Sequence, residues 1–296
     1  MKNRMLLVAG TVLGLTAAAS AQTVLASNNL HTTNTGIPGD SLVSYDFSNP
    51  GAGFTTIGVF TAPTGAPIDG VTGLDYDGNA NNPTLYAATG FGSAPGAVYT
   101  VNPNNAQAQL VGFMPNNTPI NDLAWDPNTQ TMYGVDSSQN LWRGVENPAT
   151  ASIVGNFGIG SGLEVGLGFD SRGNIYVHDL ATDAIYTGNA GSLTAISSLH
   201  AIPYNSNFSQ GLFVDWSRDN AGMHGALNAS ALTSESWGFG TQVNPGGYNF
   251  LGSFAINAGS GLPEVEVGDL TRAPIPAPGT LALLGLGGLA TVRRRR

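Results

Sequence analysis

The sequence lacks cysteine and has few charged residues. None of its 296 residues is Cys, which excludes disulfides, thiolate metal sites and cysteine nucleophiles. Only 10% of the residues are charged, against roughly 25% in typical soluble domains. Glycine (41) and proline (17) are abundant, and 42% of residues are hydrophobic. This composition predicts many short strands joined by tight turns rather than a disordered chain.

Basic residues are scarce between the two ends of the chain. Lys2 and Arg4 lie near the N-terminus, and four arginines end the sequence. The stretch between them holds four arginines against all 19 acidic residues, a formal charge of −15. Nucleic acids and anionic membrane surfaces bind clustered Lys and Arg, so the composition argues against both as partners of the folded body. It is typical of a soluble, self-repelling surface.

The first 21 residues have the layout of a secretory signal peptide. The basic residues Lys2 and Arg4 precede an apolar stretch from Met5 to Ala18. Ala19 and Ala21 then provide a small-x-small cleavage site, so signal peptidase is expected to cut before Gln22.

Residues 273–296 have the reverse order: a Pro/Ala spacer, an apolar segment and a basic end. The apolar segment from Thr280 to Val292 would form about 20 Å of helix at 1.5 Å per residue. This is short for a ~30 Å hydrocarbon core, and the arginines favour the cytoplasmic side. The segment predicts a short transmembrane helix that anchors the chain to the inner membrane transiently; a plain C-terminal tail anchor is the alternative.

This tail resembles the PEP-CTERM sorting signal, which an exosortase reads. The matching residues are Pro276, Ala277, Pro278 and Gly279, the apolar run, and the cluster Arg293, Arg294, Arg295 and Arg296. Ala277 stands where the family usually has Glu, which leaves exosortase processing an open question. The resemblance implies export through the inner membrane, cleavage near the proline pair, and a final place at the cell surface or outside the cell.

The middle of the chain contains a repeat of about 45 residues. Asp77, Asp126, Asp170 and Asp215 each end or nearly end a short apolar stretch, with spacings of 49, 44 and 45 residues. A turn rich in Asn, Asp and Gly follows each, and then three further strand-like segments. Four short strands per repeat are typical of a propeller blade, because a single four-stranded sheet cannot bury both of its faces.

The two ends of this region complete one more blade. Residues 23–29, 42–49 and 54–60 match strands two, three and four of the repeat, and residues 264–272 match strand one. The sequence therefore predicts an all-β, five-bladed propeller over residues 22–272, closed by N- and C-terminal strands. The spacing of apolar residue, Asp, turn and Tyr loosely resembles that of secreted bacterial propellers with WD40- or NHL-like blades.

The sharpest local motif is Asp75-Tyr76-Asp77-Gly78-Asn79. Alternating oxygen ligands before a glycine resemble the start of a Ca²⁺ loop, but no acidic residue stands where the loop's bidentate Glu belongs. Since Asp77 recurs in the other repeats, turn hydrogen bonding is the alternative, and the one we favour. The repeat aspartates could also converge on a central channel.

His178 and His224 occupy matching strands of neighbouring repeats. If both pointed inward they would be the one candidate metal or catalytic centre; the alternative is two structural histidines. The tryptophans could stack on sugar rings at a propeller mouth, although their repeated positions favour packing between blades. They are Trp125, Trp142, Trp216 and Trp237.

Two functions are compatible with these features. The first is an exported binding or structural module associated with an extracellular polysaccharide matrix, with no catalytic residues and no cofactor. The second is a propeller-type hydrolase or lyase with a metal or His-based site in the central channel.

Overall fold

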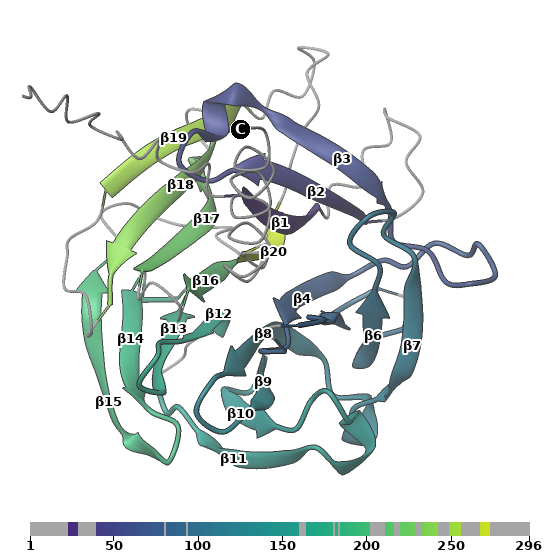
Figure 1. The fold of residues 1–296 in the computed structure, drawn as a ribbon. Helices are drawn as coiled ribbons and strands as arrows, with labels where there is room; N and C mark the ends of the chain where they lie inside the picture. The colour runs from purple at the N-terminus through teal and green to yellow at the C-terminus, as the bar shows by residue number, and fades with distance from the viewer. Residues whose placement is uncertain are drawn as a thin grey trace, which may run out of the picture.

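A computed structural model describes most of the central part of the chain and neither end. The described residues are 23–28, 40–79, 81–92, 94–159, 164–179, 181–182, 184–201, 211–215, 220–228, 233–241, 249–255 and 267–272. Within them, twenty strands form five antiparallel sheets of four strands each. The sheets stand around a common axis as the blades of a closed ring (Figure 1). The prediction of a five-bladed propeller is confirmed.

Blade 1 is made from both ends of the ring, as the sequence predicted. Its strand order is β20-β1-β2-β3, so the last strand is innermost and pairs with the first. The strands are β1 (Thr23–Asn28), β2 (Ser41–Asp46), β3 (Phe54–Val59) and β20 (Val267–Arg272).

The other four blades follow one another along the chain. Blade 2 contains β4 (Val71–Tyr76), β5 (Leu85–Thr89), β6 (Ala97–Val101) and β7 (Ala108–Phe113). Blade 3 contains β8 (Ile120–Asp126), β9 (Thr131–Asp136), β10 (Asn140–Arg143) and β11 (Ser152–Asn156). Blade 4 contains β12 (Glu164–Phe169), β13 (Asn174–Asp179), β14 (Ala184–Asn189) and β15 (Ser192–Ala201). Blade 5 contains β16 (Leu212–Asp215), β17 (Asn220–Asn228), β18 (Thr233–Gly240) and β19 (Asn249–Ala255).

Helical structure in the described residues is limited to three single 3₁₀ turns, and each begins with proline. They are η1 (Pro50–Ala52), η2 (Pro115–Asn117) and η3 (Pro148–Thr150). Proline fits the first position of a helix because its fixed φ suits the turn and its missing N–H would have no partner there. No described helix is long and apolar enough to cross a membrane. The helix predicted from the sorting tail lies outside the described residues.

The hydrophobic core lies between blades rather than within them. The buried apolar residues in the described part of the chain form five clusters, and each cluster joins two neighbouring blades. At the junction of blades 5 and 1, for example, Phe213 packs edge-on against Phe47 with ring centroids 4.9 Å apart. This arrangement follows from the alternation of side chains along a strand, which gives each sheet two apolar faces to bury.

Each outermost strand carries at least one extra residue that interrupts its pairing. The register shifts once within β3, β7, β11 and β19, at Ile57, Val111, Val154 and Leu251, and each of these residues precedes a glycine. In β15, where Gly188 of the partner strand also drops out of the ladder, the shift at Leu199 has the same place. Such bulges bend an edge strand and prevent it from pairing with another chain.

Candidate functional site

The repeat aspartates of blades 2, 3 and 4 hold the turns after their innermost strands. Asp77 accepts hydrogen bonds from the backbone N–H groups of Asn79 (3.2 Å) and Thr84 (2.9 Å). Asp126 binds its turn in the same way, and Asp170 also accepts the Tyr176 hydroxyl at 2.9 Å. The side chain of Asp215 forms an ion pair with Arg272, which joins blade 5 to blade 1.

A second set of residues lies at or near the start of the innermost strand of each blade. These residues meet at the axis of the ring. Every innermost strand region contains a leucine preceded by either glycine or aspartate. The five pairs are Gly73-Leu74, Asp122-Leu123, Gly166-Leu167, Gly211-Leu212 and Asp269-Leu270. The glycines leave no space for a side chain: a Cβ at Gly166 would lie 2.7 Å from the Cβ of Leu212. Glycine is thus required where two inner strands approach most closely.

The two aspartates of this set connect neighbouring blades through their carboxylates. Asp122 accepts the N–H of Leu123 and, at 2.5 Å, the N–H of Leu167 in blade 4. Asp269 in the same way accepts the N–H groups of Leu270 and of Leu74 in blade 2. Both residues are completely buried. Each carboxylate therefore satisfies two buried backbone donors that belong to two different blades.

Asp75 makes a third connection, between blades 2 and 3. Its carboxylate accepts the N–H of Trp125 at 2.7 Å and the N–H of Tyr76 at 2.8 Å. The hydroxyl of Thr271 in blade 1 also donates to it, at 2.5 Å. We call Asp75, Asp122 and Asp269 the axial aspartates.

The axial aspartates hold their protons more strongly than ordinary carboxyl groups. Loss of hydration in the packed ring raises the pKa of Asp75 from 3.8 to about 6, although three hydrogen bonds oppose the shift. Burial also raises the pKa values of Asp122 and Asp269, whose carboxyl groups hydrogen-bond to each other. A bond between two carboxyl groups requires a proton, so this pair keeps one proton to a higher pH than either group would alone.

The predicted metal residues whose side chains are described, Asp75, Asp77 and His178, lie in three different settings. In the described part of the chain, no group of three acidic or histidine side chains is arranged to hold a metal ion. Asp75 points to the axial connections and Asp77 to its turn. His178 is fully buried on β13, with Gly166 beside it. His224 lies on β17 of the next blade, but its side chain is outside the described set.

Two of the four tryptophans have described side chains, and both serve packing. Trp142 is buried and donates its indole N–H to Asp136 at 2.8 Å. Trp125 packs where Gly78 leaves room, because a Cβ at Gly78 would lie 2.1 Å from the indole nitrogen. Trp216 and the side chain of Trp237 lie outside the described residues, as do Ala19, Ala21 and the residues of the sorting signal.

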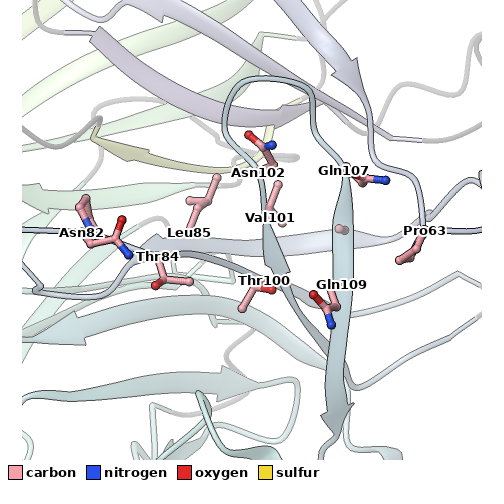
Figure 2. A pocket seen from close by; sticks show the side chains of 11 residues that line it. Pro63, Asn82, Thr84, Leu85, Thr100, Val101, Asn102, Gln107 and Gln109 are labelled. Atoms are coloured by element: carbon pink, nitrogen blue, oxygen red, sulfur yellow. The ribbon is translucent and has the colours of Figure 1, made fainter.

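A pocket of about 530 Å³ lies at the outer part of blade 2 (Figure 2). It is formed by the β6–β7 hairpin, the start of β5 and the loop that follows β3. Its polar side chains are those of Asn82, Thr84, Thr100, Asn102, Gln107 and Gln109. Its apolar wall consists of Pro63, Pro83, Leu85, Val101 and Ala108. We call it the amide pocket.

The loop beside the amide pocket is fixed to the hairpin. The N–H of Ala108 donates to the carbonyl of Thr61 at 2.8 Å, and the N–H of Thr61 donates to Ala106 at 3.4 Å. Among the described residues, no hydrogen bond to another protein group engages the side chains of Thr100, Gln107 or Gln109. These three side chains are therefore free to bind a ligand.

The pocket contains no charged side chain, for a reason that is visible in the sequence. Residues 78–121 include no Asp, Glu, Lys, Arg or His, and neither do residues 47–68. The amide pocket draws all of its lining from these two segments. Sequence reasoning missed it because the lining comes from separate segments, although this long uncharged stretch was a signal that could have directed attention to blade 2.

Comparison with known proteins identifies the C-terminal tail of the chain. Residues 274–296 match the PEP-CTERM protein-sorting motif. No curated protein matches the chain. A solved structure from Lactobacillus plantarum is 14% identical over 81% of this chain and 69% of its own, with a TM-score of 0.42. A chain in a nidogen/laminin complex is 10% identical, with a TM-score of 0.48 over 86% of this chain and 98% of its own.

The sorting motif is associated with exosortase processing, and it indicates export and membrane-associated sorting to the cell surface. The chain is thus a five-bladed β-propeller with a PEP-CTERM sorting motif at its C-terminus.

Proposed function

We propose that this exported propeller is a binding module for a neutral polysaccharide of the extracellular matrix, and that the amide pocket is its binding site. In this proposal the mature protein begins near Gln22, residues 22–272 form the working domain, and residues 273–296 are the sorting tail. The observation that carries the proposal is the chemistry of the pocket lining. It combines six amide or hydroxyl side chains with an apolar wall and has no charge.

A lining of this kind suits sugar hydroxyl groups. Each hydroxyl both donates and accepts a hydrogen bond, and the amides of Gln107 and Gln109 offer both partners. The volume of about 530 Å³ lies within the range of ordinary ligand sites. A basic ligand would find no carboxylate in the pocket. An acidic polysaccharide would be repelled by the negative charge of the whole body.

The alternative, a hydrolase or lyase at the central channel, has less support. Among the described residues, the axis is occupied by buried aspartates whose oxygens already accept backbone hydrogen bonds. His178 is also buried, so it does not face an open site. No described feature favours this second function over the first.

The proposal is tested by affinity electrophoresis of the exported protein in gels that contain a neutral glucan, a polyuronate or no polysaccharide. We expect retardation by the neutral glucan only. Replacing both Gln107 and Gln109 with Ala should weaken binding by about thirtyfold, since each lost hydrogen bond contributes ~1 kcal/mol.

Gln130→Ala is the matched control, because Gln130 is an exposed glutamine in a turn of blade 3, outside the pocket. It should bind like the unaltered protein. Equal retardation of the double variant and the control would refute the amide pocket as the site. Retardation by the polyuronate would refute the preference for neutral chains.

A further inference from the structure

Of the six large apolar side chains that are exposed among the described residues, five lie on the outermost strands of two neighbouring blades, and the sixth, Phe91, lies between β5 and β6. Leu110, Val111 and Phe113 of β7 are 42–47% exposed, and Ile153 and Val154 of β11 are 53% and 42% exposed. We call these five residues the neutral face. The two strands are linked through η3, the turn that leads into β11, because β7 contacts η3. In Figure 1 both strands run along the rim of the ring.

This face is uncharged as well as apolar. Residues 78–121 and 147–163, which contain β7 and β11, include no ionisable acidic, basic or histidine side chain. The chain between the termini has a formal charge of −15, from four arginines and 19 acidic residues. Exposed apolar side chains that gather on one part of a protein surface are typical of an interaction site.

We propose that the neutral face is the surface through which two copies of this chain form a reversible dimer. In a two-fold contact the same patch meets itself, so the neutral face of one copy would lie against the neutral face of the other. Two strongly acidic bodies repel each other in other orientations, whereas this contact adds no like charges at its centre. Sorting to one surface by the PEP-CTERM motif also concentrates the copies.

The contact uses side chains rather than strand pairing. The extra residues Val111 and Val154 interrupt the ladders of β7 and β11, so neither edge can extend continuously into a second sheet. Five side chains form a patch smaller than the ~800 Å² per partner of a standard stable interface. The dimer is therefore expected to be weak and to dissociate on dilution.

Dimerisation would also affect polysaccharide binding. This consequence, unlike the dimer itself, rests on the proposed function. Gln107, Ala108 and Gln109 line the amide pocket, and β7, which begins at Ala108, also carries three of the five residues of the neutral face. A dimer would place two pockets on one particle, which then binds a polysaccharide at two points. Two linked sites hold a chain far more firmly than one and can join separate chains.

The test is sedimentation velocity of the exported protein over a wide concentration range, without polysaccharide and at low and high salt. We expect a monomer–dimer equilibrium that shifts toward dimer at high salt, because salt screens the repulsion between acidic bodies. Ile153→Asp should abolish the dimer. Asn189→Asp adds the same charge to an exposed turn of blade 4, where the side-chain oxygen can still accept the N–H of Gly191, and should leave the dimer nearly unchanged.

A monomer at all concentrations would overturn the proposal, as would a dimer that Ile153→Asp leaves intact or that weakens in high salt. Circular dichroism of each variant establishes that it is folded. Since no polysaccharide is present, failure of the pocket proposal leaves this result unaffected. Crosslinking of a neutral glucan by the unaltered protein, but not by Ile153→Asp, tests the two-point binding separately.

Discussion

At the scale of single residues, Asp122 and Asp269 stand where other blades have glycine. Gly73, Gly166 and Gly211 allow inner strands to approach until a Cβ would touch the neighbouring strand. The two aspartates occupy the same place with a side chain that binds the neighbour's N–H instead. Burying carboxyl groups is costly, and the shared proton and the four backbone donors offset that cost.

This arrangement makes stability depend on pH in an uncommon direction. The folded ring keeps protons that the unfolded chain releases above about pH 4, so stability is full below that pH and falls as pH rises. For Asp75 the fall occurs between about 4 and 6, the two pKa values. Each retained proton contributes a slope of up to about 1.4 kcal/mol per pH unit.

We expect Asp122→Asn to have a shallower decline of unfolding free energy with pH than the unaltered protein. The amide can donate to Asp269 without a bound proton, so the variant loses the titration of the pair. Because an amide nitrogen accepts no hydrogen bond, the variant also loses one of the two backbone bonds to residue 122, which lowers its stability at every pH. Urea unfolding measured from pH 4.5 to pH 7.5 provides the comparison, with Asp46→Asn, in a blade 1 turn, as the control. Parallel curves for all three proteins would contradict the shared proton.

At the scale of strands, the bulge in each outermost strand opposes pairing of strand edges between molecules, while it still allows contact through side chains. A regular edge strand offers a continuous row of backbone donors and acceptors, which leads to aggregation. In β11, Ile153 pairs with Trp142 and Gly155 pairs with Leu141, so Val154 alone is outside the ladder. Removing it would leave the neighbouring pairs in register.

Deletion of Val154 is therefore expected to yield a folded protein that aggregates through its edge. The variant should scatter light and bind an amyloid dye after incubation at a concentration where the unaltered protein stays clear. Val154→Ala keeps the bulge while removing apolar surface, so it should remain soluble. If the deletion variant stays as clear as Val154→Ala, the bulges do not protect the edges.

At the scale of the whole molecule, five junctions hold the ring, and the one between blades 5 and 1 depends on an ion pair. Arg272 and Asp215 are both mostly buried, and loss of hydration lowers the pKa of Arg272. Arg272→Ala removes the guanidinium from the buried carboxylate of Asp215, which should cost about 3–5 kcal/mol of unfolding free energy. Arg143→Ala, at an exposed position in β10, should change stability by less than ~0.5 kcal/mol.

Urea unfolding of Arg272→Ala, Asp215→Ala and the double variant measures these free energies. It also tests whether the two charges act together. If they do, the double variant is destabilised by much less than the sum of the single changes. Additive effects would show that the pair does not stabilise the closure.

The blade count and the closure could be predicted from the sequence because both follow from a period. Four aspartates at nearly equal spacing mark the turns, and residues 264–272 complete the fifth unit. The axial aspartates could not be predicted in the same way. Asp122 and Asp269 align with glycines, so a search for repeated residues passes over them. Their role depends on how close two separate blades approach, which is a property of the folded ring.

The pairing of β1 with β20 also bears on the order in which the strands of the propeller can form. The N–H of Asp269 donates to the Ser27 hydroxyl oxygen across 242 positions of sequence. A chain exported from its N-terminus delivers β1 first and β20 last. The inner edge of β1 must then remain unpaired until nearly the whole propeller has crossed the membrane. For such a chain we expect ring closure to be the final step of folding, as the sorting motif at 274–296 reaches the membrane.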